Sequence, residues 1–585
     1  MVSKMNFFHS FRDEILNSIE KLAKKGKLPE DLALDKITTE PPRDATHGDI
    51  STNAAMILSK PANMNPRELG KLIAKELETL PYVTEVSVAG PGFINLRLAP
   101  DFWYKELKTI LKEKEEYGSS SIGLGEKINL EYVSTNPTGP MHAGHGRVAV
   151  VADVLANLLE KVGYRVLREF YVNDAGGQAE KLAQSTYLRY KEALGHEIGI
   201  IPEGYYPGDY LKEVGQALAA RDGDKWLSLP ESERLEPLRE FSINAMMTMI
   251  RKDLALMGIN HEVFTSETEL HRLGAVEEAI QTLKEKGLIY EGVLEPPKGR
   301  VIENWKPRKQ MLFRSSEFGD DADRPLQKAD GSWAYFAGDI AYHYDKFRRG
   351  YPNMINVWGA DHVGTVKRVI SAVKAITEGK GHLDVILCQI VNFMEGGKPV
   401  KMSKRAGTFI EIKEVINKVG RDAFRFMMIT RKSDAHLDFD FKKVLEQTRD
   451  NPVFYIQYAH ARCHSVMRMA EDVFPKWSET SAELYAGLND PDELHLLKLL
   501  AAWPRHVEIA ATTREPHRLC YALYEIAAQF HMLWNKGKEN TLFRFIIADN
   551  KELTRARLAM IQGLATIIAS GFQIIGVTPV KEMRE

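Results

Sequence analysis

The stretch that decides the fold begins with Ile128-Asn129-Leu130-Glu131-Tyr132-Val133 and reaches His142-Ala143-Gly144-His145 through a polar turn that contains two prolines. The first six residues form a largely apolar run, which predicts a buried strand. After the turn, apolar residues recur every three or four positions from Val148 to Val162, which predicts a helix that ends at Gly163. Two histidines and a glycine are therefore expected in the first turn of a helix that follows a strand.

This predicted helix start has the features of a phosphate site. Unpaired N–H groups and the positive end of the helix dipole favour anions there, and Gly144 lets a nucleotide approach the backbone closely. His142 and His145 can donate hydrogen bonds to phosphate oxygens as negative charge builds. The pattern suits attack on the α-phosphate of ATP with loss of pyrophosphate.

A second motif, Lys401-Met402-Ser403-Lys404, stands much later in the chain between Gly396-Gly397 and Gly407. Its two lysines can bring mobile positive charge to the same phosphates. Each motif alone has a simpler interpretation, because histidines can cap a helix and lysine-rich surface loops are common. The two motifs in this order, with strand, turn and helix around the first, favour the interpretation as an ATP site.

Composition limits the classes of protein that fit. A chain of 585 residues predicts several domains, and a net charge of −2 gives no global attraction to nucleic acid, so RNA binding would use local patches. Cys388, Cys463 and Cys520 lie far apart without a C-x-x-C motif, so we expect no disulfide framework and no structural zinc. A reducing, cytoplasmic setting fits, and we expect neither a signal peptide nor a run of membrane-spanning length.

Four regions follow from the patterns along the chain. Residues 1–117 predict a small α+β domain with helices near its start and at 66–77, strands at 83–88 and 93–98, and a charged helix at 104–116. Residues 118–390 predict a catalytic domain with a helical insertion at about 185–250. Residues 391–450 hold the lysine loop and a connector, and residues 451–585 predict a helical domain.

The catalytic region predicts a parallel sheet. A second strand at 165–172 completes a strand–helix–strand unit, so ligands are expected at the carboxyl ends of the strands. Further strands are predicted at 262–264, 333–336, 354–358 and 385–391. The fold class is therefore α/β multidomain.

Four segments together resemble class I aminoacyl-tRNA synthetases, and most closely the arginyl-tRNA synthetases. They are Glu131 to Arg147, Val357-Trp358-Gly359-Ala360-Asp361-His362, Val400 to Gly407, and Asp450-Asn451-Pro452 to Arg462. The similarity runs essentially from end to end. It implies a Rossmann-type catalytic domain, an N-terminal additional domain on the D-loop side of the tRNA, and a C-terminal all-α anticodon-binding domain.

The resemblance also implies the reaction. A member of this family activates L-arginine with ATP to arginyl-adenylate, releases pyrophosphate, and transfers arginine to the 3′ end of tRNA(Arg). Mg²⁺ is expected with ATP and without a dedicated protein cage. The family further implies a cytoplasmic monomer without membrane association, in which adenylate formation waits for bound tRNA.

The resemblance assigns the catalytic roles to both motifs. The catalytic residues would be His142, His145, Lys401 and Lys404, and ATP would contact His142, Gly144, His145, Gly359, Asp361, Met402, Ser403 and Lys404. The histidines would stabilise the ribose and phosphate part of ATP, and the lysines would hold the leaving pyrophosphate.

The arginine pocket is expected from the same resemblance. Arginine carries a planar fork of five donors, so its pocket needs carboxylates or other acceptors. Glu267 and Asp339 would bind the guanidinium, Tyr335 would lie beside it, and Asn136 would hold the α-amino or carboxylate end. His362 stands where many relatives have glutamine, which leaves its role less defined. Any single acid is more often a solvated surface residue, but the position of Asp339 after the predicted 333–336 strand favours a site.

For tRNA, Phe93 and Asn95 fall where relatives contact a D-loop base, and Tyr458 and Arg462 lie in the predicted anticodon-binding domain. Together with Tyr455, Trp503 and Trp534, these two residues could stack on and clamp anticodon bases. The simpler interpretation is that most of these aromatic side chains pack in the protein core.

Three alternatives stay open at this point. A synthetase for another amino acid would share both motifs, and a small nucleotidyltransferase would share the histidine motif but lack the helical tail. The lack of a cysteine–histidine zinc set argues against the cysteine type. A synthetase-like binding protein without catalysis would have no need of both histidines and both lysines.

Overall fold

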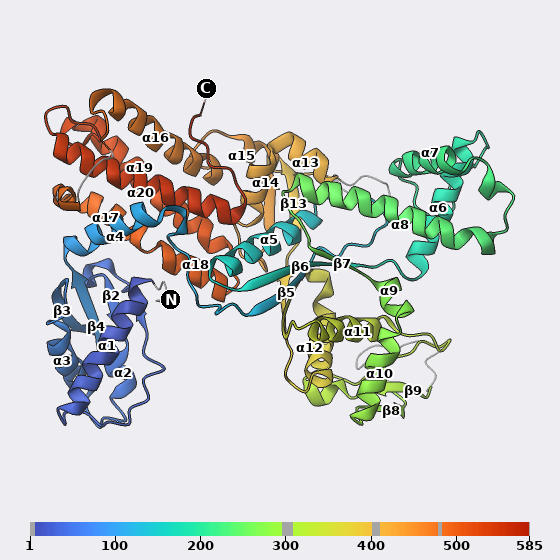
Figure 1. Cartoon of the computed structure of the whole chain (residues 1–585), viewed down its shortest axis with the longest axis horizontal. Coiled ribbons are helices and arrows are strands. Elements are labelled where there is room, and N and C mark those ends of the chain that lie inside the picture. The colour runs from blue at the N-terminus through green and yellow to red at the C-terminus, as the bar shows by residue number, and fades with distance from the viewer. Residues whose placement is uncertain (1–5, 295–307, 401–409, 478–481, 584–585) are drawn as a thin grey trace. The chain divides into compact units, whose positions relative to one another are not determined.

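The protein is described from a computed structural model that covers residues 6–294, 308–400, 410–477 and 482–583 (Figure 1). The chain forms two compact units. One combines Met1–Leu124, Lys161–Gly163 and Gln447–Glu585, and the other combines Gly125–Glu160 with Tyr164–Glu446. The predicted fold class is confirmed, since the second unit is built on a parallel sheet and the last part of the chain is helical.

The parallel sheet of the second unit has five strands in the order β12-β11-β5-β6-β7. These are β5 (Lys127–Tyr132), β6 (Arg165–Val172), β7 (Val263–Ser266), β11 (Asn353–Gly359) and β12 (His382–Cys388). All four pairings are parallel. The chain order reverses between β5 and β11, and in open α/β sheets ligands bind at the carboxyl ends of the strands beside such a switch.

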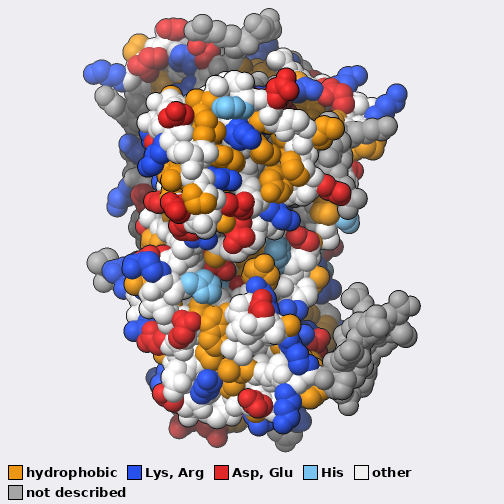
Figure 2. Space-filling model, turned by 90° about the vertical axis from the view of Figure 1, so that its right-hand side faces the viewer, with side chains coloured by type: hydrophobic (Ala, Val, Ile, Leu, Met, Phe, Trp, Pro, Cys, Tyr) orange, Lys and Arg blue, Asp and Glu red, His pale blue; other side chains and the backbone are white. Residues whose placement is uncertain are grey.

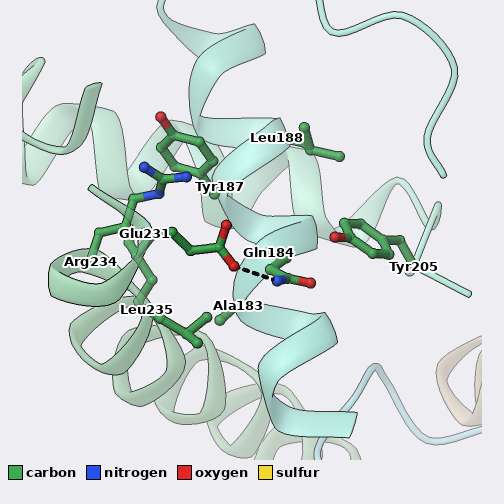
Figure 3. Close-up of a pocket in the computed structure, with 9 residues that line it drawn as sticks. Ala183, Gln184, Tyr187, Leu188, Tyr205, Glu231, Arg234 and Leu235 are labelled. Carbon is green, nitrogen blue, oxygen red and sulfur yellow. Dashed lines mark hydrogen bonds between the residues drawn. The ribbon is translucent and has the colours of Figure 1, made fainter. Parts of the chain in front are cut away.

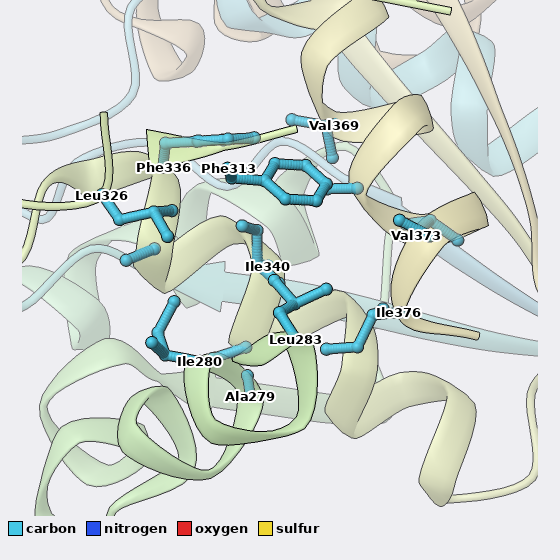
Figure 4. Packing of buried hydrophobic residues seen from close by; sticks show 14 of the residues in the cluster. Ala279, Ile280, Leu283, Phe313, Leu326, Phe336, Ile340, Val369, Val373 and Ile376 are labelled. Carbon is cyan, nitrogen blue, oxygen red and sulfur yellow. The ribbon is translucent and has the colours of Figure 1, made fainter. Parts of the chain in front are cut away.

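Helices cover both faces of this sheet. In Figure 1, α5 (His145–Lys161) and α8 (Glu231–Leu256) lie on one side of the strands, and α11 (Tyr335–Arg348) and α12 (Val363–Ile376) lie on the other. Apolar residues of α10 (Ala275–Glu285), α11 and α12 form one core cluster with Phe313 and Leu326 (Figure 4). This packing holds the start of α11 in place, and the predicted pocket residues Tyr335 and Asp339 lie there.

The remaining elements of the second unit are short or inserted. The insertion comprises α6 (Gly177–Ala193), α7 (Tyr210–Asp222) and α8, packed around Tyr190 and Trp226. A small antiparallel sheet consists of β8 (Ile289–Gly292), β9 (Gln310–Phe313) and β10 (Arg324–Pro325). The connector holds β13 (Val391–Glu395), β14 (Lys398–Pro399), α13 (Ile412–Val419), α14 (Arg421–Met428), β15 (Leu437–Asp440) and α15 (Phe441–Leu445).

The first unit begins with an α+β region. Its sheet has the antiparallel order β1-β2-β4-β3, from β1 (Thr39–Glu40), β2 (Ile50–Thr52), β3 (Val83–Ala89) and β4 (Phe93–Leu98). Its helices are α1 (Phe7–Lys24), α2 (Ala54–Leu58), α3 (Pro66–Leu77) and α4 (Pro100–Glu113). The predicted hairpin and α3 are present, and two short strands add to the sheet.

The helical part of the first unit comprises α16 (Pro452–Val473), α17 (Pro491–Ala501), α18 (Trp503–Thr512), α19 (His517–Glu539) and α20 (Lys551–Ile575). By length and composition α20 could cross a membrane, which corrects the expectation that no run reaches that length. However, 78% of its most apolar window is buried inside the protein. The helix is apolar on nearly all sides because other helices of this part surround it.

One predicted strand is wrong. Residues 333–336 were expected to form a strand, but α11 begins at Tyr335. A short apolar run cannot by itself distinguish a strand from a buried helix, and here the apolar pattern continues through Phe336, Ile340 and Ala341 at helical spacing. The predicted strand at 385–391 also differs, because β12 ends at Cys388 and β13 begins at Val391.

Charge is not segregated on the face of the molecule in Figure 2. Lys and Arg side chains lie among Asp and Glu side chains across this face, and hydrophobic side chains reach the surface in narrow strips between them. On this face the mixture agrees with the net charge of −2.

Candidate active site

The histidine motif lies between β5, which ends at Tyr132 beside the switch point of the sheet, and α5. The expectation that both histidines lie in the first helical turn is wrong for His142, because α5 begins at His145. The preceding residues are extended: Ala143 N donates to Ile410 O at 2.8 Å, and Ile412 N donates to Met141 O at 3.0 Å. This backbone pairing with the connector holds His142 just outside the helix.

The two imidazole rings stack on each other. Their centroids are 3.6 Å apart with an angle of 25° between the ring planes. The backbone N–H of His142 donates to Nδ1 of His145 at 3.3 Å, so Nε2 of His145 carries a proton and faces Thr135 Oγ1 at 3.2 Å. A Cβ on Gly144 would lie 3.0 Å from the His142 ring, so the glycine makes room for the stack.

The second motif, Lys401 to Lys404, lies outside the described residues, but the chain on both sides of it is well placed. Before it, Val400 N donates to Phe393 O at 2.8 Å, where β14 pairs with β13. After it, Ile410 to Ile412 pair with the backbone beside His142. The chain that follows the lysine motif is therefore anchored from Ile410 to Ile412 beside the histidine motif.

Glu267 is the first residue of α9 (Glu267–Arg272), directly after β7. Its side chain is buried, and burial together with the neighbouring charge of Asp174 raises its pKa to about 7. Asp174 is fixed by two hydrogen bonds, from Ser266 Oγ at 2.6 Å and from the Thr268 backbone at 2.8 Å. These bonds tie the turn after β6 to the start of α9.

Asp339 lies in the second turn of α11 and not at a strand end, which corrects the sequence-based placement. Burial, and after it the charges of Glu131 and Glu267, raise its pKa to about 7. A Cβ on Gly338 would come within 3.7 Å of Glu267 Oε1, so this helix passes close to the other carboxylate. Two carboxyls with raised pKa values therefore lie together beyond the ends of the strands, as expected for a site that awaits a cation.

The other three residues of the expected arginine pocket are more open. Asn136 is exposed and donates from Nδ2 to Gln178 Oε1 at 3.0 Å. Tyr335 is 72% exposed, and Lys328 Nζ lies 5.0 Å from its ring centroid. The His362 side chain is 60% exposed. Tyr335 and His362 are thus the exposed members of this set, whereas Glu267 is buried and Asp339 half-buried.

The segment after β11 borders the same switch point. Gly359 ends the strand, and a Cβ there would lie 2.5 Å from Asp361 Oδ1, so the Asp361 carboxylate turns back over the strand end. The Asp361 side chain is 81% exposed and 3.7 Å from His362 Nε2. Gly359 and Asp361 thus lie across the switch point from the histidine motif, where an ATP ribose or base would be reached.

Family models match three parts of the chain. Residues 9–98 match the arginyl tRNA synthetase N terminal domain, residues 106–434 match the class I (R) tRNA synthetase catalytic domain, and residues 456–583 match the DALR anticodon binding domain. The chain belongs to the arginyl-tRNA synthetase family.

Individual relatives agree with this membership. The chain is 55% identical to an arginine–tRNA ligase of Parvibaculum lavamentivorans, an alignment covering 99% of this chain and all of the relative. It is 52% identical to that of Methylorubrum extorquens over the same shares. The arginyl-tRNA synthetase structure of Thermus thermophilus shares the fold with a TM-score of 0.69 at 20% identity, covering 98% of this chain and all of that one.

In the N-terminal domain of this family member, the two residues expected to face tRNA differ in exposure. Phe93 is 40% exposed at the start of β4, and Asn95 is only 3% exposed between Ser51 and Ser87 of the neighbouring strands. Phe93 is thus available for stacking on a base. Asn95 in this form lies within the sheet.

In the anticodon-binding domain, Arg462 is the centre of an aromatic cluster. Its guanidinium lies 3.9 Å from the ring centroid of Tyr458 and 4.6 Å from that of Trp534, and Nη2 donates to Tyr458 Oη at 2.5 Å. Tyr455 stacks nearby on His531, with centroids 4.3 Å apart. Trp503 is fully buried and belongs to the core. Its ring is therefore not exposed for stacking on a base.

A second hollow, of about 210 Å³, lies between α6 and α8 in the helical insertion (Figure 3). Its polar groups already pair with one another: Gln184 Nε2 donates to Glu231 Oε1 at 2.9 Å, and the Arg234 guanidinium lies 4.0 Å over the Tyr187 ring. These polar groups of the hollow therefore already have partners within the insertion, and we assign the hollow no part in the catalytic site.

Sequence reasoning missed several polar residues under the pocket. Glu131 entered the sequence analysis only as part of a predicted strand and its motif, and no role was predicted for Asp174, Glu169 or Lys346. One signal was present in the sequence: an acid stands inside each of two otherwise apolar strands, and buried acids need a partner. Their partners at α11, Lys346 and Arg349, can be identified only from the fold.

Proposed function

We propose a specific division of labour for the reaction of this family member. The protein is an arginine–tRNA ligase: it uses ATP to activate arginine and transfers the arginyl group to tRNA. The finer assignment, in which named residues bind each substrate, rests on the arrangement at the switch point of the sheet.

One observation carries the assignment of the amino-acid site. Glu267 is buried and Asp339 half-buried, and the pKa values of both carboxyls rise to about 7, each partly because of a neighbouring acid. An empty site of this kind is stabilised by a ligand that brings positive charge and several donors, and a guanidinium brings both. A neutral or acidic amino acid would leave the carboxyls unpaired at a cost of several kcal/mol.

In the activation step, the α-carboxylate of arginine attacks the α-phosphorus of ATP. A bond forms between the carboxylate oxygen and phosphorus as the bond to the β-phosphate oxygen breaks, and pyrophosphate leaves. Nε2–H of His145, which faces Thr135 in the free protein, is the donor assigned to the α-phosphate, with His142 beside it. Lys401 and Lys404 are assigned to the leaving pyrophosphate.

ATP would use the histidine motif with Gly144, the Gly359–Asp361 segment, and Met402 and Ser403. Mg²⁺ would accompany the ATP phosphates and neutralise part of their charge. Across the described ranges, which leave out 401–409, no group of three or more His, Cys, Asp or Glu side chains could hold a metal ion. Mg²⁺ therefore has no further role in the proposal.

In the transfer step, the terminal ribose hydroxyl of tRNA attacks the acyl carbon, and AMP leaves. Phe93 is proposed to stack on a D-loop base, with Asn95 shaping the strand beneath it. Tyr458 and Arg462 are proposed to bind the anticodon arm. We further propose that bound tRNA is needed for activation and that tRNA(Arg) is the accepted species.

The protein is also proposed to act as a cytoplasmic monomer. The Cys388 thiol is buried, and burial raises its pKa to about 12, so it is protected from oxidation chemistry that needs a thiolate. Sedimentation of the free protein at micromolar concentration would test the oligomeric state, and a dimer would contradict this part of the proposal.

The decisive experiment is amino-acid-dependent ATP–pyrophosphate exchange with and without tRNA. Arginine should give far more exchange than citrulline, its neutral isostere, and than a panel of other amino acids. Asp339→Asn should raise the KM for arginine by at least 10²-fold and change the KM for ATP by less than twofold, because an amide cannot provide a full negative charge.

Glu278→Gln is the matched control for Asp339→Asn, because Glu278 is an exposed acid of α10 that pairs with Arg348 on the outside of α11. Its KM values should equal those of the wild type. Faster exchange with any other amino acid than with arginine would overturn the assignment of the pocket.

A further inference from the structure

A row of buried polar side chains crosses the parallel sheet beneath the arginine pocket. Asn356 of β11 is the register partner of Glu131 of β5, and Glu131 is the partner of Glu169 of β6. None of these three residues is more than 4% exposed. Strands of a parallel sheet covered on both faces are ordinarily apolar, so two adjacent buried acids and an amide need an explanation.

Two cations of α11 pair with the two acids. Lys346 Nζ lies 2.9 Å from Glu131 Oε2, and the two side chains are 0% and 5% exposed. Arg349, the cap residue at the end of the helix, donates from Nη2 to both oxygens of Glu169 at 2.8 and 2.9 Å. The Glu169 side chain is fully buried. One helix therefore neutralises both acids of neighbouring strands.

From Lys346, a chain of hydrogen bonds leads through Asn356 and His343 to the backbone of Asp339. Lys346 Nζ donates to Asn356 Oδ1 at 3.2 Å, and Asn356 Nδ2 lies 2.8 Å from His343 Nε2. His343 Nδ1 lies 2.7 Å from the Asp339 carbonyl oxygen, which can only accept. The His343 ring is thus neutral with its proton on Nδ1, which agrees with a pKa that burial lowers to about 3.

From Glu131, hydrogen bonds lead to the turn that precedes the histidine motif. Glu131 Oε1 accepts from Ser134 Oγ at 3.0 Å, and Ser134 Oγ accepts from the Tyr171 backbone at 3.0 Å. Val133 and Ser134 have φ values of 70° and 40°, a left-handed conformation that costs non-glycine residues roughly 1–3 kcal/mol each. Asn136 and the histidine motif follow this strained turn along the chain. Glu131 stabilises the turn through its hydrogen bond with Ser134.

The ion pair of Arg349 and Glu169 connects in the same way to the strand that precedes Glu267. Glu169 Oε1 also accepts from Thr265 Oγ1 at 2.5 Å. Thr265 is the third residue of β7, and two residues later Glu267 begins α9. Both ion pairs therefore connect by short, directed hydrogen bonds to the backbone that carries Glu267, Asp339 and Asn136.

We propose that Lys346 and Arg349 form a two-cation latch that sets the positions of Asp339 and Glu267 for binding the guanidinium of arginine. Lys346, Arg349, Glu131 and Glu169 are positioning residues and do not touch the substrate. This inference rests on the proposed arginine pocket. A latch that only docked α11 on the sheet would stabilise the fold without affecting one substrate more than another.

A pair-deletion series separates the two roles. Lys346→Met leaves Glu131 buried without its partner, so it should lower the melting temperature and raise the KM for arginine by about 10- to 100-fold, as expected when a site moves by about 1 Å. The double variant Glu131→Gln with Lys346→Met removes both charges. Its melting temperature should recover most of the loss, because replacing a buried ion pair by neutral groups of similar size is well tolerated.

The KM for arginine decides the outcome. In the double variant it should stay raised while the KM for ATP stays within twofold of the wild-type value, because the hydrogen bond from Lys346 to Asn356 is still missing. A return of both melting temperature and arginine KM to wild-type values would overturn the proposal, as would a parallel rise of the arginine and ATP KM values. If Lys346→Met does not fold, Ser134→Ala, which removes the hydrogen bond to Glu131 and the one from the Tyr171 backbone, gives the same comparison.

Arg348→Met is the matched control on the same helix, since Arg348 pairs with Glu278 and is 53% exposed. It should leave both KM values unchanged. The proposed pocket is tested separately by Asp339→Asn. An ineffective Asp339→Asn would refute the pocket, whereas an effective Asp339→Asn beside wild-type arginine KM values in the latch variants would refute the latch alone.

Discussion

The raised pKa values of Glu267 and Asp339 make arginine binding depend on pH near neutrality. In the free protein both carboxyls titrate at about 7, and a bound guanidinium favours their ionised forms. Arginine binding should therefore release protons at pH 7. The perturbation is a change of pH from 8 to 6 with arginine as the only ligand.

The magnitude follows from the titration of one carboxyl. With a pKa of about 7 in the free protein, the dissociation constant varies as one plus the ratio of protonated to ionised carboxyl, which gives a roughly tenfold weaker affinity at pH 6 than at pH 8, or about 1.4 kcal/mol. If both carboxyls must ionise, the ratio approaches about 100-fold. Because the charge of Glu267 raises the pKa of Asp339, the two titrations are coupled, and we expect a value between these limits.

The sign of the effect is opposite for binding and for stability. Arginine affinity is complete above about pH 8 and is lost as pH falls through 7. In the free protein, the folded-state pKa values lie above the ordinary values of these groups, so the free energy of unfolding declines as pH rises from about 4 to 7. The increase in melting temperature caused by arginine should consequently be larger at pH 8 than at pH 6.

Calorimetric titration in two buffers of different ionisation enthalpy measures both quantities. About 0.5 to 1 proton should be released per arginine at pH 7, since each carboxyl is half protonated there, and Asp339→Asn should release fewer than the wild type. Citrulline, which has no charge to stabilise the carboxylates, is the ligand control and should release none. An arginine dissociation constant that stays the same from pH 6 to 8, without proton release, would refute this reasoning.

Four further outcomes are expected. His145→Ala should lower kcat for activation by about 10²–10³, or roughly 3–4 kcal/mol, with little change in arginine binding; normal exchange in the folded variant would contradict its role. Lys404→Ala should slow adenylate formation far more than transfer from preformed adenylate in single-turnover assays, because pyrophosphate is present only in the first step. Gly146→Ala should cost about 1–3 kcal/mol in denaturant unfolding, since its Cβ would lie 2.4 Å from Phe424 Cζ, and an unchanged midpoint would show that α14 can move away. Arg462→Ala should raise the KM for tRNA at an unchanged melting temperature, and the lost binding should be salt-sensitive.

Elements with a clear period could be predicted from the sequence. The strand at 165–172 and the helix at 66–77 have the predicted bounds, because a long apolar pattern between turn residues leaves one solution. The start of α11 could not be predicted in the same way. Trp333 to Phe336 is too short a run to show a period, and what decides its state is the packing of Phe336 and Ile340 against α10 and α12.

The site was predicted in part for the same kind of reason. Motif residues such as His142 and Glu267 follow strand ends, and strand ends meet at one edge of a parallel sheet. The pairing of Glu131 with Lys346 depends on which strand lies beside which and on where α11 crosses them. Nothing local to either residue contains that information, so only the fold could reveal it.

Charge balance links the latch to the choice of substrate. Lys346 and Arg349 lie within hydrogen-bond distance of Glu131 and Glu169, so the cations of α11 are already used by the acids of the sheet. Lys328 and Arg368 lower the pKa values of Glu267 and Asp339 only in part, since both values stay at about 7. Among the described residues, the carboxyls of Glu267 and Asp339 therefore lack a cation of their own, because those of α11 pair with the acids of the sheet. A bound guanidinium would supply that positive charge. If this reasoning is right, Glu131→Gln should lower the pKa of Asp339, because it removes a charge that raises this pKa and leaves the charge of Lys346 that lowers it. The pH at which arginine affinity is lost should then shift to a lower value. An unshifted pH profile in a folded Glu131→Gln variant would show that the latch and the pocket are electrostatically independent.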